Sequence, residues 1–136
     1  MIIVLVHWLI KTGIDHEEKF KKVWKNMTIE PNTGLYREIL TSVEVNDNPK
    51  FNTFSLANPA YTTFINIGIW KDLKSFDDAV GKYILAPERR EPLAKPGTEM
   101  EAVYLQDFEF KLRERVVLSK VFDRQGALEL PEADLH

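Results

Sequence analysis

Cysteine is absent from the 136-residue sequence. Disulfide bonds, thiolate catalysis and cysteine-based metal or iron–sulfur sites are therefore excluded. The sequence also lacks a basic stripe or block, and its formal net charge is −3, so neither a nucleic-acid partner nor an anionic membrane surface is expected. It contains no glycine-rich phosphate loop, no Ser-His-Asp arrangement and no spaced carboxylate pair.

Long hydrophobic runs are also missing. The longest, residues 2–10, is about half the length of a membrane-spanning helix. It has neither the positive flank nor the small-residue cleavage site of a secretory signal, so we expect a cytoplasmic protein. Hydrophobic residues make up 44% of the chain and charged residues 29%, which indicates a globular domain. We expect one domain over 1–136, with a core at 2–111 and an extension at 112–136 that is loosely ordered after residue 123.

The first half of the chain has a strand–helix–strand pattern. Residues 2–11 are apolar and rich in β-branched side chains, which predicts a strand that is apolar on both faces. Asp15 followed by Glu18 resembles a capping box, and the apolar stripe behind it predicts a helix over 16–28. Residues 35–45 alternate and predict a second strand; one face carries Leu35, Ile39, Val43 and Val45, and the other carries Tyr36, Glu38, Ser42 and Glu44.

The second half repeats the pattern after a loop at 50–61. A strand is expected at 62–70 and a helix at about 74–85, with Asp72 and Ser75 as candidate caps. Strands are further expected at 101–111 and 115–122. The order β-α-β-β-α-β, followed by an extra C-terminal strand, predicts an α+β domain.

Two helices with one apolar stripe each can cover only one face of such a sheet. We expect them to cover the face that carries Ile65, Ile67 and Ile69. The opposite face would then expose an aromatic set, which is too large a patch for a monomer. Its members are Phe64, Trp70, Tyr104, Phe108 and Phe110. A homodimer packed through that sheet face is the expected cover, and the protein's own loop and C-terminal segment are the alternative.

Asn66 is the clearest candidate for chemistry. An amide is disfavoured inside a strand and must be hydrogen-bonded when buried, either to a ligand or to a neighbouring group. Trp70 shares its strand face, and Gly68 between them leaves space against the sheet. His7, inside the first strand, is either a general base or a core residue with one backbone partner. Arg90, in a charged connection, is either solvated or placed over a cavity mouth, where it could bind an anionic oxygen.

The sequence resembles that of the antibiotic-biosynthesis-monooxygenase-like (ABM-like) group of dimeric α+β barrels. The resemblance covers about residues 2–110 and is carried by three segments: the first strand with residues 10–15, Gly34-Leu35-Tyr36, and Asn66 to Phe76. It implies a ferredoxin-like protomer with an antiparallel sheet, packed face to face with a second copy. It also implies a pocket beside the strand at 62–70, to which we assign Phe64, Gly68, Phe76, Tyr83 and Tyr104 as substrate-binding residues.

The same resemblance implies a cofactor-independent monooxygenase in which Asn66 and Trp70 activate O₂ with a phenolic substrate and Arg90 assists. The tyrosine that this group carries early in the second helix is replaced by Phe76, which puts proton handling in doubt. Haem-degrading members ligate iron through a histidine in that helix, where this chain has Val80, so haem is disfavoured. The three histidines show no ligand spacing, and we expect neither a metal nor a cofactor.

Two other functions stay open. One is a non-catalytic, stress-related dimer whose pocket holds a small hydrophobic or aromatic ligand, with a ligand-raised melting temperature and no turnover. The other is an isomerase or lyase with His7 as the base.

Overall fold

The computed structural model of the protein describes residues 1–27, 33–43, 48, 50, 61–81 and 115–135. The strand expected at 101–111 lies outside these residues, as do most of the loop at 50–61 and the last four residues of the helix expected at 74–85. Arg90, Tyr83 and Tyr104 lie outside them too.

The described elements form one antiparallel sheet with two helices. In chain order they are β1 (Ile2–Lys11), α1 (Ile14–Asn26), β2 (Leu35–Ser42), β3 (Tyr61–Trp70), α2 (Leu73–Val80) and β4 (Arg115–Ser119). The four strands lie in the order β2-β3-β1-β4, and every pairing is antiparallel. This α+β arrangement is compatible with a ferredoxin-like fold. The β4 strand falls within the segment expected to be the C-terminal strand; a further strand at 101–111 stays a prediction.

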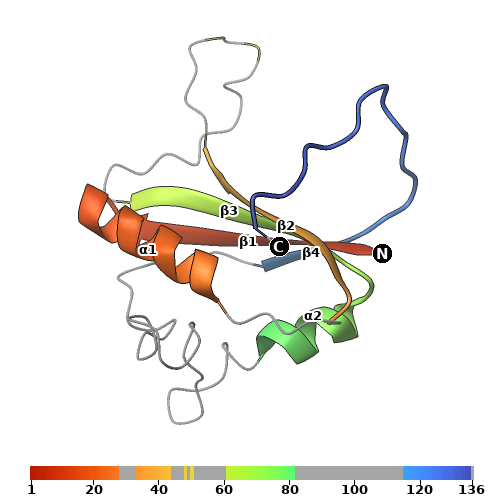
Figure 1. Ribbon diagram of the computed structural model, residues 1–136, viewed down its shortest axis with the longest axis horizontal. Coiled ribbons are helices and arrows are strands. Elements are labelled where there is room, and N and C mark those ends of the chain that lie inside the picture. Colours follow the sequence, from red (N-terminus) through yellow and green to blue (C-terminus); the bar gives the residue numbers. More distant parts are fainter. Residues whose placement is uncertain (28–32, 44–47, 49, 51–60, 82–114, 136) are drawn as a thin grey trace.

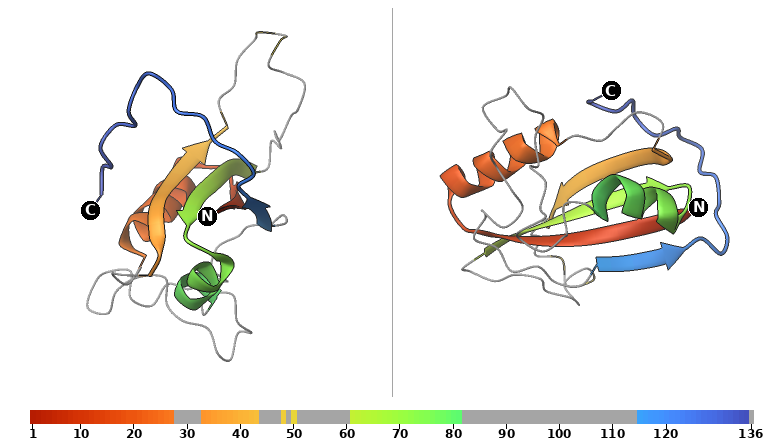
Figure 2. Two further views of the ribbon diagram at one scale, coloured as in Figure 1. Left: turned by 90° about the vertical axis from the view of Figure 1, so that its right-hand side faces the viewer. Right: turned by 90° about the horizontal axis from the view of Figure 1, so that it is seen from below.

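Both helices lie on the same side of the sheet (Figures 1 and 2). They cover the face that carries Phe64 and Trp70, together with alternate residues of β1. The prediction that they would cover Ile65, Ile67 and Ile69 was therefore wrong. Strand alternation sorts side chains into two faces, but here both faces are apolar, so the pattern alone could not say which one the helix stripes would meet.

The core on the covered face is largely aromatic. Phe20 of α1 stacks on Phe64 with ring centroids 5.1 Å apart, and Trp8 meets Phe20 edge-on at the same distance. At the other end of the sheet, Trp70 meets Phe76 of α2 edge-on at 5.5 Å. Such pairs add about 0.5–1.5 kcal/mol each beyond the area they bury. Phe64 and Trp70, which were expected on an exposed sheet face, thus lie in the core; the other three members of that set lie outside the described residues.

A β-bulge in β2 changes which of its side chains face the core. Leu35 pairs with Trp70 and Arg37 pairs with the next residue, Ile69, so Tyr36 is the extra residue of the bulge. From there on Glu38, with Leu40 and Ser42, shares the face that the helices cover. The sequence pattern had placed Glu38 opposite Leu35, and the bulge is the physical reason that this prediction was wrong.

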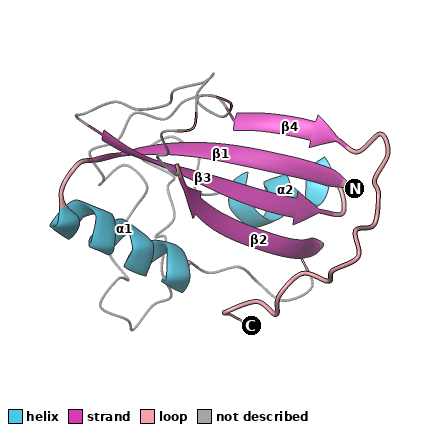
Figure 3. Cartoon of the chain, turned by 90° about the horizontal axis from the view of Figure 1, so that it is seen from above, coloured by secondary structure: helices cyan, strands magenta, loops and turns pink. Residues whose placement is uncertain are grey.

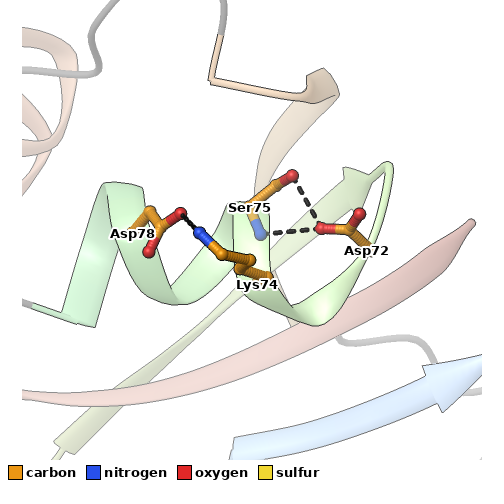
Figure 4. Close-up of polar contacts among 4 residues, drawn as sticks. All are labelled: Asp72, Lys74, Ser75 and Asp78. Carbon is orange, nitrogen blue, oxygen red and sulfur yellow. Dashed lines mark hydrogen bonds and ion pairs between the residues drawn. The ribbon is translucent and has the colours of Figure 1, made fainter.

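The helices begin in two different ways. The first starts two residues earlier than expected, after Gly13 at φ 142°, and has no side-chain cap, so the capping box predicted at Asp15 was wrong. The second is capped as predicted (Figure 4): Oδ1 of Asp72 accepts from the backbone N–H of Ser75 at 2.8 Å and from its hydroxyl at 2.7 Å. These bonds lower the pKa of Asp72, and Lys74 pairs with Asp78 at 2.6 Å on the outer side.

The second face of the sheet, which we call the open face, carries a half-buried apolar set: Ile3, Leu5, Ile39, Ile65, Ile67, Ile69 and Val116. Residues 120–135, here called the C-terminal arm, follow β4 without a helix or strand of their own. The arm rises on the side opposite the helices (Figure 1) and passes the N-terminus to reach the β2 side of the sheet (Figure 3). Its side chains are exposed except at Ala133, which is half-buried.

Candidate functional site

Asn66 occupies the centre of the covered face, where it pairs with Val6 of β1 and Leu40 of β2. Only 7% of its surface is exposed. A buried amide left without partners would cost about 1–3 kcal/mol, so its contacts decide what it does.

Both ends of this amide are engaged. The indole Nε1 of Trp24, on α1, donates to Oδ1 of Asn66 at 3.1 Å. The amide Nδ2 of Asn66 in turn donates to Oε1 of Glu38, on β2, at 2.6 Å. An indole N–H can only donate, and a carboxylate oxygen accepts, so these two neighbours fix the orientation of the amide between them. The result is a chain of three side chains, Trp24–Asn66–Glu38, that ties α1 to β3 and β2.

Glu38 is the titratable member of this chain. Burial raises its pKa above the ordinary value of 4.5, and the hydrogen bond from Asn66 lowers it again to a smaller extent. Within the described residues no hydrogen bond reaches its second oxygen, Oε2, and no buried polar atom is left without a partner. A carboxyl with a raised pKa at a cavity wall can act as a general base or acid.

A cavity of about 500 Å³ lies beside Glu38, between α1, β2 and the end of the C-terminal arm. Trp24, Glu38 and Phe64 line it, with Leu40 and Ser42 of β2. This volume is within the range of sites for small organic molecules, which extend from about 300 to 1,000 Å³. Asn66 is not itself on the wall; it lies behind Trp24 and Glu38 and holds both in place.

Basic side chains and the arm form the outer part of the cavity. Lys21 and Lys25 come from α1 and Arg37 from β2, while Ala133, Asp134 and Leu135 close it from the arm. Lys21 is paired with Glu18 at 3.1 Å. Over the described part of the chain, no ion pair forms at Lys25 or Arg37. The cavity therefore combines an aromatic inner wall, the carboxyl group of Glu38, and a rim with three cationic side chains and the carboxylate of Asp134.

The predicted site residues are brought together only in part. Phe64 lines the cavity. Trp70 is 1% exposed and packs on Phe76, away from the cavity wall. A Cβ atom at Gly68 would lie 2.5 Å from Nε1 of Trp70, so the glycine makes room for this indole, whereas space for a ligand had been expected there.

His7 lies on the opposite face from Asn66, because it pairs with Ile65 while its neighbour Val6 pairs with Asn66. It is half-buried there and does not line the cavity. The cavity-lining carboxyl that sequence reasoning missed is that of Glu38, which the alternation had placed on the strand face opposite Leu35 and Ile39. A signal was present: Arg37 and Leu40 break the alternation of this strand, and such a break is typical of a bulge that reverses the faces.

The described residues contain no group of three His, Asp or Glu side chains placed to hold a metal ion. Neither of the two helices in this part of the chain is long and apolar enough to cross a membrane.

Compared with known proteins, the chain matches no family model, no curated protein and no solved structure. The ABM-like resemblance therefore depends on the sequence segments quoted above.

Proposed function

We propose that the protein binds a small phenolic substrate, aromatic or polyketide-like, in the cavity beside Glu38, and that this carboxylate takes the substrate's acidic proton. The observation that carries the proposal is the position of Glu38: a carboxyl with a raised pKa at the wall of a cavity of ligand size, held by the amide of Asn66. The aromatic side chains of Trp24 and Phe64 offer flat apolar surfaces to a ring.

Proton removal would make the substrate an electron-rich phenolate or enolate, which can reduce O₂ without a cofactor. In the overall reaction a CH₂ group of the substrate and one O₂ give a carbonyl group and one water molecule. Carbon is oxidised by four electrons, and both oxygen atoms are accounted for. This is the cofactor-independent monooxygenation that the sequence resemblance suggests, with Glu38 as base. Asn66 is then a positioning residue, because its contacts reach the substrate only through Glu38 and Trp24.

Oxygen consumption with a panel of hydroquinone- and anthrone-type compounds tests the proposal. Glu38→Gln keeps the shape of the side chain and should lower kcat by at least about 10²-fold, since a positioned base contributes about 10²–10⁴-fold. Asn66→Ala should shift the pH profile of kcat to higher pH, because it removes the hydrogen bond that lowers the pKa of Glu38. Unchanged turnover in Glu38→Gln would refute the role of this residue as base.

Binding without turnover is the second candidate. Both polar ends of Asn66 are occupied by protein groups, and Trp70 is enclosed in the core, so neither side chain is placed to meet a substrate directly. In that case ligands of the same panel would raise the melting temperature and no oxygen would be consumed.

An isomerase or lyase with His7 as the base is less well supported. This histidine and the cavity beside Glu38 lie on opposite faces of the sheet. In this cavity Glu38 would be the base for such chemistry too.

We further propose that the working unit is a homodimer packed through the open face. Seven half-buried aliphatic side chains lie on that face, and both helices lie on the other side. Apolar patches of this kind on soluble proteins commonly mark interfaces, and twofold homodimers are the commonest assemblies. The sequence had suggested dimerisation through the aromatic face; the proposal now rests on the aliphatic one.

A further inference from the structure

The outer part of the cavity differs in charge from the rest of the molecule. The chain has 18 Lys and Arg against 21 Asp and Glu, so it is acidic overall. Three cationic side chains nevertheless converge on this one cavity, namely Lys21, Lys25 and Arg37. Lys21 already has a carboxylate partner in Glu18. Since Lys25 and Arg37 have none within the described residues, two cationic groups remain available to a ligand.

Local structure explains why these charges meet. Lys21 and Lys25 are four residues apart and follow each other along the helix on the same side as Trp24, whose indole reaches Asn66. Arg37 follows the bulge of β2, directly before Glu38, and its pairing with Ile69 places it on the open face of this edge strand. It reaches the cavity from that side, whereas Glu38 reaches it from the covered face. Helix and strand thus supply cations to the same opening from two sides.

The C-terminal arm gives an independent indication of what this opening accepts. Residues 127–135 include three acidic side chains, Glu129, Glu132 and Asp134, and no Lys or Arg. Of residues 120–135, Ala133 is the half-buried one, and it reaches the cavity together with Asp134 and Leu135. An acidic residue followed by an aliphatic one therefore lies at the basic rim, although most of the arm stands away from the protein.

We infer that the ligand of this cavity is an organic acid with an apolar body. Its carboxylate lies between Lys25 and Arg37, where charge-assisted hydrogen bonds are available, and its apolar part extends inward over Phe64 and Leu40. The arm competes for the rim through Asp134 and Leu135. This inference rests on the proposed function, since it names the class of molecule that the same cavity binds, and it limits the phenolic substrates considered above to those that also carry a carboxylate.

Isothermal titration calorimetry, which measures the binding of a matched pair of probes to the full chain, tests the inference. 1-Naphthoate carries a carboxylate at neutral pH, and 1-naphthol has the same ring system without that charge. We expect naphthoate to bind more tightly than naphthol. The double variant Lys25→Gln/Arg37→Gln should bind naphthoate about tenfold more weakly and leave naphthol unchanged. Asp134→Asn, which weakens the competing arm, should bind naphthoate more tightly than the wild type.

The control is Lys22→Gln/Lys71→Gln, which makes the same change of charge at two exposed lysines that do not line the cavity. An equal loss of naphthoate affinity in this control would overturn the inference, because the effect would then come from overall charge. Equal binding of the two probes, unaffected by Lys25→Gln/Arg37→Gln, would also overturn it while leaving the ligand-binding proposal intact. If neither probe binds, the cavity is not a ligand site and the proposed function fails as well.

Discussion

At the scale of single residues, the site depends on how Asn66 is satisfied. The sequence predicts correctly that an amide inside an apolar strand needs a partner, but the partners lie 42 and 28 residues away, and their identity follows from packing. Because both ends of the amide are used by Trp24 and Glu38, the proposed reactive group is the Glu38 carboxyl and not Asn66. The amide holds that carboxyl and lowers its pKa, against the larger effect of burial, which raises it.

The half-buried carboxyl of Glu38 should make the stability of the fold depend on pH. Its pKa is raised on folding, so the folded protein retains this proton at pH values where the unfolded chain has lost it, and stability falls as the pH rises through that interval. Glu38→Gln has no such charge. We expect its free energy of unfolding, relative to the wild type, to increase as the pH rises above the ordinary pKa of 4.5, measured by urea denaturation at a series of pH values. The exposed Glu129→Gln is the matched control, and a constant difference across these pH values would contradict the expectation.

The close approach at Gly68 predicts a packing defect. A methyl group there would meet the indole of Trp70, which is enclosed in the core and can move little. Gly68→Ala should therefore destabilise the fold by about 1–3 kcal/mol, as overpacked cores commonly do. Urea denaturation should compare this variant with Ala79→Gly, which removes a buried methyl group. The comparison separates the effect of crowding in Gly68→Ala from the effect of lost packing in Ala79→Gly. A neutral Gly68→Ala would show that the space beside this glycine is free for a ligand after all.

At the scale of elements, periodicity placed the strands β1 and β3 to within a residue, because their apolar runs are bounded by glycine, lysine and aspartate. Facing was harder. Tyr36 adds one residue to β2, and every side chain after it changes sides, which brings Glu38 to the covered face and to the cavity. Arg37 and Leu40 break the alternation in the sequence, but only the pairing with β3 identifies Tyr36 as the extra residue.

The cap of α2 gives an element-scale prediction with the opposite dependence on pH. Hydrogen bonds from Ser75 lower the pKa of Asp72, so its stabilising contribution is complete above about pH 4 and is lost as the pH falls further through the lowered pKa. Asp72→Ala should lower the urea midpoint at pH 7, and the deficit should shrink as the solution is acidified below pH 4. Asp77→Ala is the control, because Asp77 lies in the same helix but does not cap it. A deficit that does not change with pH would rule out the charged cap as its cause.

At the scale of the whole molecule, the sequence predicted that the two helices would cover only one face of the sheet, and within the described residues both helices lie on one face. The prediction of which face the helices cover was wrong for a definite reason. Both strands at the centre of the sheet are apolar on both sides, and only the packing of Trp8, Phe20 and Phe64 shows which side the helices cover. The path of the arm could not be foreseen, because residues 120–135 have no periodic pattern that would show that their far end lines a cavity with α1 and β2.

The open face predicts the assembly. Size-exclusion chromatography with light scattering at micromolar concentration should give a dimer for the wild type. Ile67→Asp, at the centre of the open face between Leu5 and Ile39, should give a monomer, because a charge there cannot be buried against an apolar partner. Leu73→Asp adds the same charge to an exposed residue of α2 and should leave the dimer intact. A monomeric wild type would contradict this account of the open face.

The central claim is that Glu38, held by Asn66, is a half-buried acid with a raised pKa at the cavity wall, and carboxyl-carbon NMR titration of this residue tests it most directly. We predict that Glu38 titrates above its ordinary pKa of 4.5 in the wild type. In Asn66→Ala it should titrate higher still, because the hydrogen bond that favours the carboxylate is gone. Titration at or below the ordinary value in the wild type, with no change on removal of Asn66, would contradict the account.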